Sequence, residues 1–153
     1  MQSYAQVTSD DVKPSGYPYA LPISKLRGVP HSARVALKSR KITNCSQLLT
    51  AAGEASRRLA LAQQIGADPE LLVRIVQRAD MARVNGVGAV FGLMLEDLGI
   101  RDVAALARQA PEHLHAQVRD YNQQERIARR SPTPEEVQEW VTQARALEKI
   151  ITY

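Results

Sequence analysis

The sequence predicts an all-helical fold, and three observations support this expectation. Ala, Leu, Val, Gln and Arg dominate while only 5% of the residues are aromatic, which favours helices over sheets. Apolar residues recur at helical spacing, and no long alternating run of β-branched residues occurs. Residues typical of helix starts and stops divide this pattern into segments. With 153 residues, 44% of them apolar, the chain can form one compact core or two small halves that share one.

Residues 1–22 are expected to form an irregular arm that precedes a single helical domain at 23–153. The segment combines Tyr4, Tyr17 and Tyr19 with three prolines and a glycine, namely Pro14, Pro18, Pro22 and Gly16, which disfavour a regular element. An exposed arm rich in tyrosine could pack on its own domain, stack on bases or insert into a partner.

The first part of the domain, residues 23–53, is predicted to be two helices joined by a tight hairpin. A short helix at Ile23–Arg27 is followed by the hairpin Gly28–Pro30 and a second helix at His31–Lys41. Thr43 is the expected N-cap of a further short helix that ends near Gly53. The residues of the second helix expected to face the core are Ala33, Ala36 and Leu37.

Two longer helices are predicted next. In Glu54–Ile65 the apolar stripe is Leu59, Ala62 and Ile65, and Gly66 is a good C-terminal stop. Within this helix, Arg57 and Arg58 are interpreted as surface charges or as caps of carbonyl groups. Asp68 and Pro69 then fit the N-cap and first position of another helix. Its apolar positions are Leu71, Leu72, Ile75, Val76 and Ala79.

A second cassette, residues 81–110, repeats the pattern of the first with an offset of 58 residues. In both, an apolar residue and a glycine hairpin precede an amphipathic stretch, which is typical of a helix-hairpin-helix motif. The matching pairs are Leu26 and Val84, Gly28 and Gly86, Leu37 and Leu95, Ile42 and Ile100, and Leu48 and Leu106. The sequence therefore predicts an internal duplication.

Residues 111–150 are predicted to form a C-terminal helical pair. Pro111 begins a helix with Leu114, Val118 and Tyr121 on one face. Thr133-Pro134-Glu135-Glu136 is a capping-box start for the last helix. Trp140 is expected in the core because it lies on the apolar stripe of Val137, Trp140, Val141, Ala144 and Leu147.

Several segments together resemble a bacterial family known as "domain of unknown function 4332". They are Leu72–Met81 running into Ala82–Gly88, Pro111–His115, Arg130–Pro134, Val137–Trp140 and Ile151–Tyr153. The resemblance extends from about Ile23 to Tyr153. It implies a helical fold of the helix-hairpin-helix or sterile-alpha-motif-like type and no established activity. Nucleic-acid binding in related helix-hairpin-helix families is an analogy.

Positive charge is concentrated in the first cassette. The stretch from Val12 to Gly53 contains seven Lys or Arg and no Asp or Glu, although the net charge of the chain is only +4. The second cassette is balanced, and the final helix is mildly acidic. Such a field attracts phosphate groups or an acidic protein surface. The six cations of the cassette are Lys25, Arg27, Arg34, Lys38, Arg40 and Lys41.

These patterns favour a non-catalytic domain that binds nucleic acid, duplex or single-stranded, without sequence preference. In helix-hairpin-helix domains, backbone N–H groups of the hairpin contact a phosphate and flanking cations hold its neighbours. Gly86, Val87 and Gly88 keep all their N–H donors but have no cation beside them in the sequence, whereas Pro30 removes one donor from the cation-rich hairpin. Either hairpin could be the functional one.

A protein-interaction adaptor with an acidic partner is the alternative. Replacing Gly88 by a bulky residue separates the two, because it should damage backbone phosphate binding and would impair an adaptor only through misfolding.

Catalytic, metal and cofactor sites are not expected. His113 and His115 lie about 200° apart around a helix and cannot share a metal. Glu96 and Asp97 are interpreted as surface or helix-dipole carboxylates. The single cysteine, Cys45, is expected to be a bland thiol and indicates a reducing compartment. No run of 18 apolar residues occurs, so we expect a cytoplasmic protein.

Overall fold

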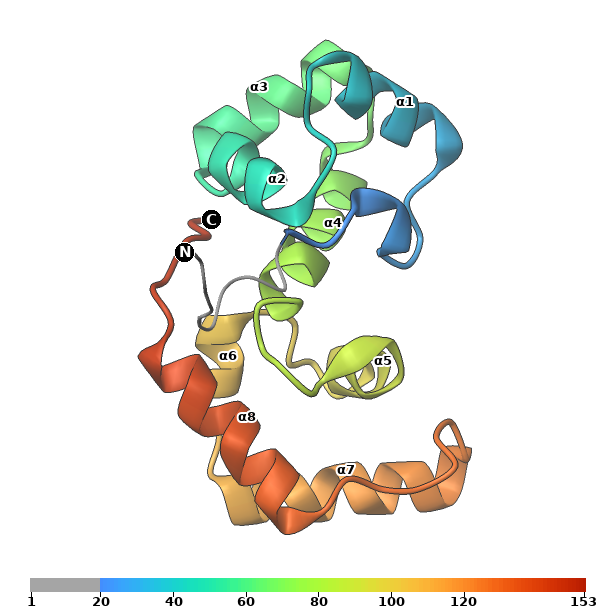
Figure 1. The fold of residues 1–153 in the computed structure, drawn as a ribbon, viewed down its shortest axis with the longest axis vertical. Coiled ribbons are helices and arrows are strands. Elements are labelled where there is room, and N and C mark those ends of the chain that lie inside the picture. The colour runs from blue at the N-terminus through green and yellow to red at the C-terminus, as the bar shows by residue number, and fades with distance from the viewer. Residues whose placement is uncertain (1–19) are drawn as a thin grey trace, which may run out of the picture.

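The computed structural model describes residues 20–153, and this part of the chain is helical without a β-strand (Figure 1). A short 3-10 helix, η2, spans Ile23–Lys25, so the first predicted helix is shorter than expected. The α-helices that follow are α1 (His31–Ser39), α2 (Cys45–Ala52), α3 (Ala55–Ile65), α4 (Pro69–Met81), α5 (Gly88–Asp97), α6 (Val103–Ala107), α7 (Pro111–Glu125) and α8 (Pro134–Ala146). The all-helical prediction is confirmed.

Most of the predicted arm, with Tyr4, Tyr17 and Tyr19, lies outside the described residues. Its last two residues pair with the segment that begins α2. The Leu21 carbonyl oxygen accepts a hydrogen bond from the Cys45 amide at 2.9 Å, and Pro22 forms an isolated antiparallel bridge with Asn44.

The helix boundaries follow local capping chemistry. Asp68 and Thr133 cap α4 and α8 as predicted, and Gly66 ends α3 with a left-handed φ of 67°. The predicted cap Thr43 is wrong by one residue: Asn44 caps α2, accepting from the Gln47 amide, and the Gln47 side chain accepts in return from the Asn44 amide. Asparagine suits this position because its short carbonyl reaches the free N–H groups of the first turn.

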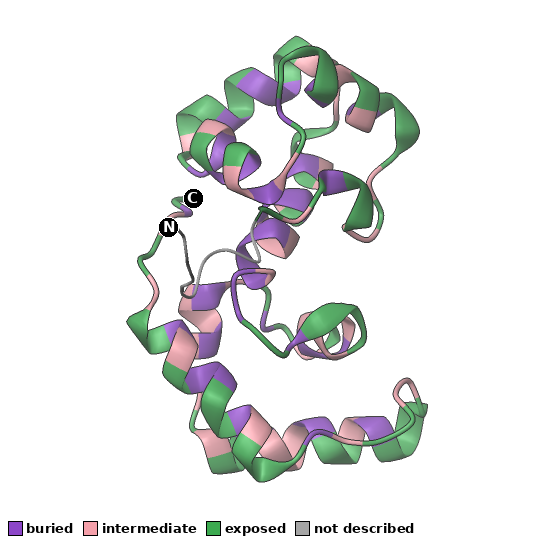
Figure 2. Cartoon of the chain, in the orientation of Figure 1, coloured by how far each residue is buried: buried purple, intermediate pink, exposed green. Residues whose placement is uncertain are grey.

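The helices form two consecutive groups of four, α1–α4 and α5–α8, stacked along the long axis of the molecule (Figure 1). Each group surrounds its own apolar core, and the buried faces point inward (Figure 2). Helix α4 links them, because its buried apolar residues from Leu72 to Ala79 pack in one core while its last residue, Met81, belongs to the other. Trp140 is only 1% exposed and fills the second core as predicted.

The two cassettes share backbone geometry at corresponding positions. Gly28 and Gly86 both have positive φ, at 71° and 92°, and Lys41 and Gly99 do so at 62° and 86°. Asn44 caps α2 as Asp102 caps α6. Three of the predicted apolar pairs are buried in both copies, namely Leu37 and Leu95, Ile42 and Ile100, and Leu48 and Leu106. In the fourth pair Val84 is buried, but Leu26 is only half-buried. The helix-hairpin-helix assignment itself stays a prediction.

The predicted stripe of α3 is partly wrong. Leu59 is 49% exposed, while Leu61 and Ala62 are buried. The reason is Arg58, whose buried guanidinium donates to the carbonyl oxygens of Ala52, Gly53 and Thr152. Because neighbouring helical residues are about 100° apart, turning Arg58 inward turns Leu59 outward. Ala36 of α1 is likewise only half-buried.

Residues after α8 return to the first group of helices. Ile151 is buried in the first core. The Thr152 amide donates to the Gly53 carbonyl oxygen at 3.0 Å, and the Tyr153 hydroxyl donates to Asp102 Oδ2 at 2.6 Å. The two halves are therefore joined at both α4 and the tail. Within residues 20–153, no helix has the length and apolar character of a membrane span.

Candidate nucleic-acid interface

The first hairpin is a tight turn that Arg78 of α4 holds in place. Arg78 Nη1 lies 2.6 Å from the point where a Cβ atom on Gly28 would sit. The same nitrogen donates to the Arg27 carbonyl oxygen at 2.7 Å. Gly28 also has a φ of 71°, which L side chains rarely adopt. The turn thus requires glycine both for its backbone angle and for the close approach of Arg78.

The second hairpin packs on α8. Gln143 brackets Asn85, accepting from its amide at 2.8 Å and donating to its carbonyl oxygen at 3.0 Å. Trp140 Nε1 lies 3.5 Å from a Cβ atom placed on Gly86. Val87 is buried in the second core and is not among the residues that line the cleft described below, so the structure does not expose it to a ligand as predicted. Gly88 begins α5, whose N-terminus has no side-chain cap. The first N–H groups of α5 therefore have no hydrogen-bond acceptor within the helix.

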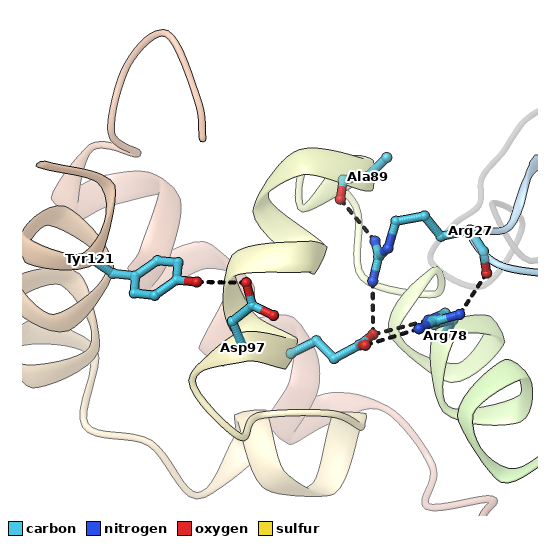
Figure 3. Close-up of polar contacts among 6 residues, drawn as sticks. Arg27, Arg78, Ala89, Asp97 and Tyr121 are labelled. Carbon is cyan, nitrogen blue, oxygen red and sulfur yellow. Dashed lines mark hydrogen bonds and ion pairs between the residues drawn. The ribbon is translucent and has the colours of Figure 1, made fainter. Parts of the chain in front are cut away.

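One carboxylate, Glu96 of α5, connects the two hairpins. Its two arginine partners, Arg27 and Arg78, are labelled in Figure 3. Arg27 donates through Nη2 to Glu96 Oε1 at 2.8 Å, and through Nη1 to the Ala89 carbonyl oxygen at 3.1 Å. Arg78 donates to both carboxylate oxygens of Glu96, through Nε and Nη2, at 3.0 Å each. These bonds, those from Arg78 first, hold the pKa of Glu96 below its ordinary value.

The second hairpin consequently has a cation beside it, which the sequence did not indicate. Arg27 belongs to the first cassette, yet its guanidinium lies at the first turn of α5. Together with Lys25, Gly86 and Gly88 it lines one cleft of about 530 Å³ between the two halves. The fold therefore combines the cation-rich hairpin with the donor-rich one at a shared rim.

The remaining predicted cations form a second group on α1. Lys38, Arg40 and Lys41 are exposed, at the end of the helix and just after it. Arg34 is half-buried, one turn before Lys38, and its Nη2 lies 2.9 Å from His31 Nδ1. No hydrogen bond joins this group to the second hairpin in the part of the chain that the structure describes. The six predicted cations are thus divided between the cleft rim and α1.

Sequence reasoning missed three charged residues of this region. Arg78 and Arg101 line the cleft, but they are far in sequence from the basic run. Glu96 was interpreted as a surface or helix-dipole carboxylate, whereas its side chain is 22% exposed and bonded to two arginines. No local pattern marks Glu96 or Arg78, because the two arginines bonded to Glu96 lie 18 and 69 positions away from it.

Outside the cleft, the thiol of Cys45 and the hydroxyl of Tyr121 both have structural surroundings. Cys45 is buried in the first core, and burial raises the pKa of its thiol to about 11, which disfavours the nucleophilic thiolate. Tyr121 donates to Asp97 Oδ2 at 2.6 Å, linking α7 to α5 (Figure 3). Among residues 20–153, no three His, Cys, Asp or Glu side chains are grouped to hold a metal ion.

Comparison with known proteins gives one match. The sequence profile of DUF4332, described as a domain of unknown function, matches residues 27–147. Neither the curated proteins nor the solved structures contain a match to this chain.

Proposed function

We propose that this chain, which belongs to the DUF4332 family, is a non-catalytic module that binds the phosphate backbone of nucleic acid without sequence preference. Its two cassettes act as tandem helix-hairpin-helix units, and its place is the bacterial cytoplasm, in keeping with a single, buried cysteine.

The observation that carries the proposal is the exposed cationic group on α1. Lys38, Arg40 and Lys41 have no carboxylate within ion-pair distance among residues 20–153. Their charges are therefore not neutralised by the described part of the protein, and a polyanion can release its counterions on meeting them. Arg34 extends this group by one helical turn toward the first hairpin.

The cleft rim has a smaller part in phosphate binding. Lys25 is exposed there, and the first amides of α5 lack a side-chain cap. Arg27, however, already shares the Glu96 carboxylate with Arg78. Since Glu96 offsets part of the local positive charge, we assign most of the binding free energy to α1.

The test is fluorescence anisotropy of labelled DNA and RNA, duplex and single-stranded, with the wild type and a variant carrying Arg34→Ala, Lys38→Ala, Arg40→Ala and Lys41→Ala. For one small patch we expect a wild-type Kd on the order of 10⁻⁴ to 10⁻⁶ M that weakens steeply from about 50 to 200 mM salt. The variant should bind at least about tenfold more weakly and with a shallower salt slope.

The matched control removes the same number of cations elsewhere, at Arg74, Arg108, Arg119 and Arg129, which are exposed. It should bind more tightly than the α1 variant although both carry the same net charge. Equal binding by the two variants would mean that net charge alone, and not the position of the cations on α1, determines the affinity. If the wild type binds none of the probes at the lowest salt, nucleic acid is not the ligand and an acidic protein partner takes its place.

A further inference from the structure

We propose that the cleft between the two halves binds a small amphiphilic anion, an aliphatic body with one negatively charged head group. This site goes beyond the proposed function, because its ligand is a small molecule held inside the cleft and not a polyanion on α1.

The size and lining of the cleft suit an aliphatic body. Its volume of about 530 Å³ lies within the range of roughly 300–1,000 Å³ that is usual for small-molecule sites. Both halves supply apolar walls, which buries the ligand between them. The apolar side chains are those of Leu21, Leu26, Met81, Val84 and Ile100.

Glycines keep the α5 side of the cleft open. Gly86, Gly88 and Gly92 all line it, and none carries a side chain that could fill it. Gly92 has no positive φ, and a Cβ atom there would meet only Val87 Cγ1, at 3.7 Å. A larger residue at position 92 is therefore compatible with the helix. The fold does not need a glycine there, and its effect is to leave the cleft open.

The charges around the cleft select an anion. Lys25, Arg27, Arg78 and Arg101 line it against one carboxylate, that of Glu96. Arg27 and Arg78 already form ion pairs with Glu96. Lys25 and Arg101 are exposed and have no carboxylate within ion-pair distance in residues 20–153. The uncompensated charges of these two lining cations would attract an anionic head group, whereas a cationic ligand would meet repulsion.

The lining also disfavours a nucleotide as the occupant. Within residues 20–153, no aromatic side chain lines this cleft, so the described walls offer a base no stacking surface of the kind that single-strand binding uses. An aliphatic chain needs only apolar contact, which the walls provide.

The experiment is isothermal titration of the wild-type protein with decanoate below its micelle concentration, beside decanol and decyltrimethylammonium. Trp140, the single tryptophan of the chain, packs under Gly86 at the edge of the cleft and gives a fluorescence signal. We expect saturable binding of decanoate at one site, about tenfold weaker binding of decanol, and no binding of the cation.

Three variants locate the site. Gly92→Leu fills the cleft and should abolish decanoate binding, with circular dichroism and the Tm confirming that the variant is folded. Lys25→Ala with Arg101→Ala should reduce decanoate to the level of decanol. Arg108→Ala, outside the cleft, should bind decanoate like the wild type.

The α1 variant used for nucleic acid should retain decanoate binding, so failure of one proposal leaves the other testable. The small-molecule site is overturned if decanoate does not bind at millimolar concentration, if folded Gly92→Leu binds it unchanged, or if decanol and the cation bind as well as decanoate does.

Discussion

Glu96 determines how much of the basic hairpin is available to a ligand. Its side chain is 22% exposed and accepts from Arg27 and Arg78 at once. A partly buried carboxylate with two guanidinium partners forms strong, charge-assisted hydrogen bonds. Two of the cations around the cleft are thereby used to join the halves of the molecule.

Glu96→Gln should destabilise the protein by about 1–3 kcal/mol at neutral pH, because two arginines lose their charged acceptor. The folded-state pKa of Glu96 lies below its ordinary value of 4.5. The ionised carboxylate therefore stabilises the fold fully above that value, and its contribution disappears as the pH falls through the folded-state pKa. Urea denaturation from pH 7 to 3 should show the wild type and the variant converging in stability on acidification. A constant difference would contradict this role.

Lys41→Gly should raise the free energy of unfolding by about 1 kcal/mol while weakening nucleic-acid binding. Lys41 has a left-handed φ of 62°, and the corresponding residue of the second cassette is Gly99. Glycine removes the conformational cost of a side chain there. Lys41→Ala is the control, since it loses the same charge but keeps the Cβ atom. Thermal denaturation of both variants separates the effect of backbone strain from that of the lost charge. An equal Tm for Lys41→Gly and Lys41→Ala would contradict strain at residue 41.

Residue types and spacing predicted the two glycine hairpins, the repeated apolar pairs and the burial of Trp140. They could not predict that Arg27 reaches the first turn of α5, because the contact spans 62 residues and depends on how the halves stack. The same holds for Arg78, whose partners come from the hairpin and from α5. Local pattern specifies helices, whereas the composition of the site follows from their docking.

At the scale of the helices, capping residues determine where each element starts. Thr43 and Asn44 are both good capping residues by composition, and only the geometry distinguishes them. Asn44 has an extended backbone and accepts from the Gln47 amide at 2.8 Å. Thr43 Oγ1 instead donates to the Gln47 side chain at 3.1 Å.

Asn44→Ala should therefore cost about 1 kcal/mol of stability through loss of the cap of α2. Thr43→Ala is the matched control and should cost less than about 0.5 kcal/mol, as exposed substitutions usually do. Chemical denaturation of the two single variants decides between them. A larger loss of stability for Thr43→Ala than for Asn44→Ala would mean that Thr43 is the cap of α2, as the sequence predicted.

Helix α3 shows why an apolar stripe alone can mislead. The sequence leaves Arg58 as a surface charge or a cap of carbonyl groups, and the structure shows the second: its buried guanidinium donates to the carbonyl oxygens of Ala52, Gly53 and Thr152. One of these carbonyls belongs to the tail, 94 residues away. The rotation of α3 is thus set by a long-range contact that α3 itself does not reveal.

For the whole molecule, the structure predicts that two cores unfold as one unit. Ile151 lies in the first core and Trp140 in the second. Helix α4, the tail and the bonds to Glu96 all cross between the halves. Such contacts favour cooperative unfolding.

Ile151→Ala removes apolar contacts of the first core and should destabilise the protein by about 2–5 kcal/mol. If the halves are coupled, Trp140 fluorescence and far-UV circular dichroism should report the same, lowered denaturation midpoint. A Trp140 transition that stays at the wild-type midpoint while the dichroism changes would mean that the halves unfold independently.

The central claim, that the first cassette forms a phosphate-binding face, is tested most directly by mapping the contact on the folded protein. Titration of ¹⁵N-labelled protein with a short DNA duplex at low salt should shift amide resonances of residues 25–41, with smaller shifts at Gly88 and Ala89, and added salt should reverse them. Shifts confined to other helices, or none at all, would contradict this assignment.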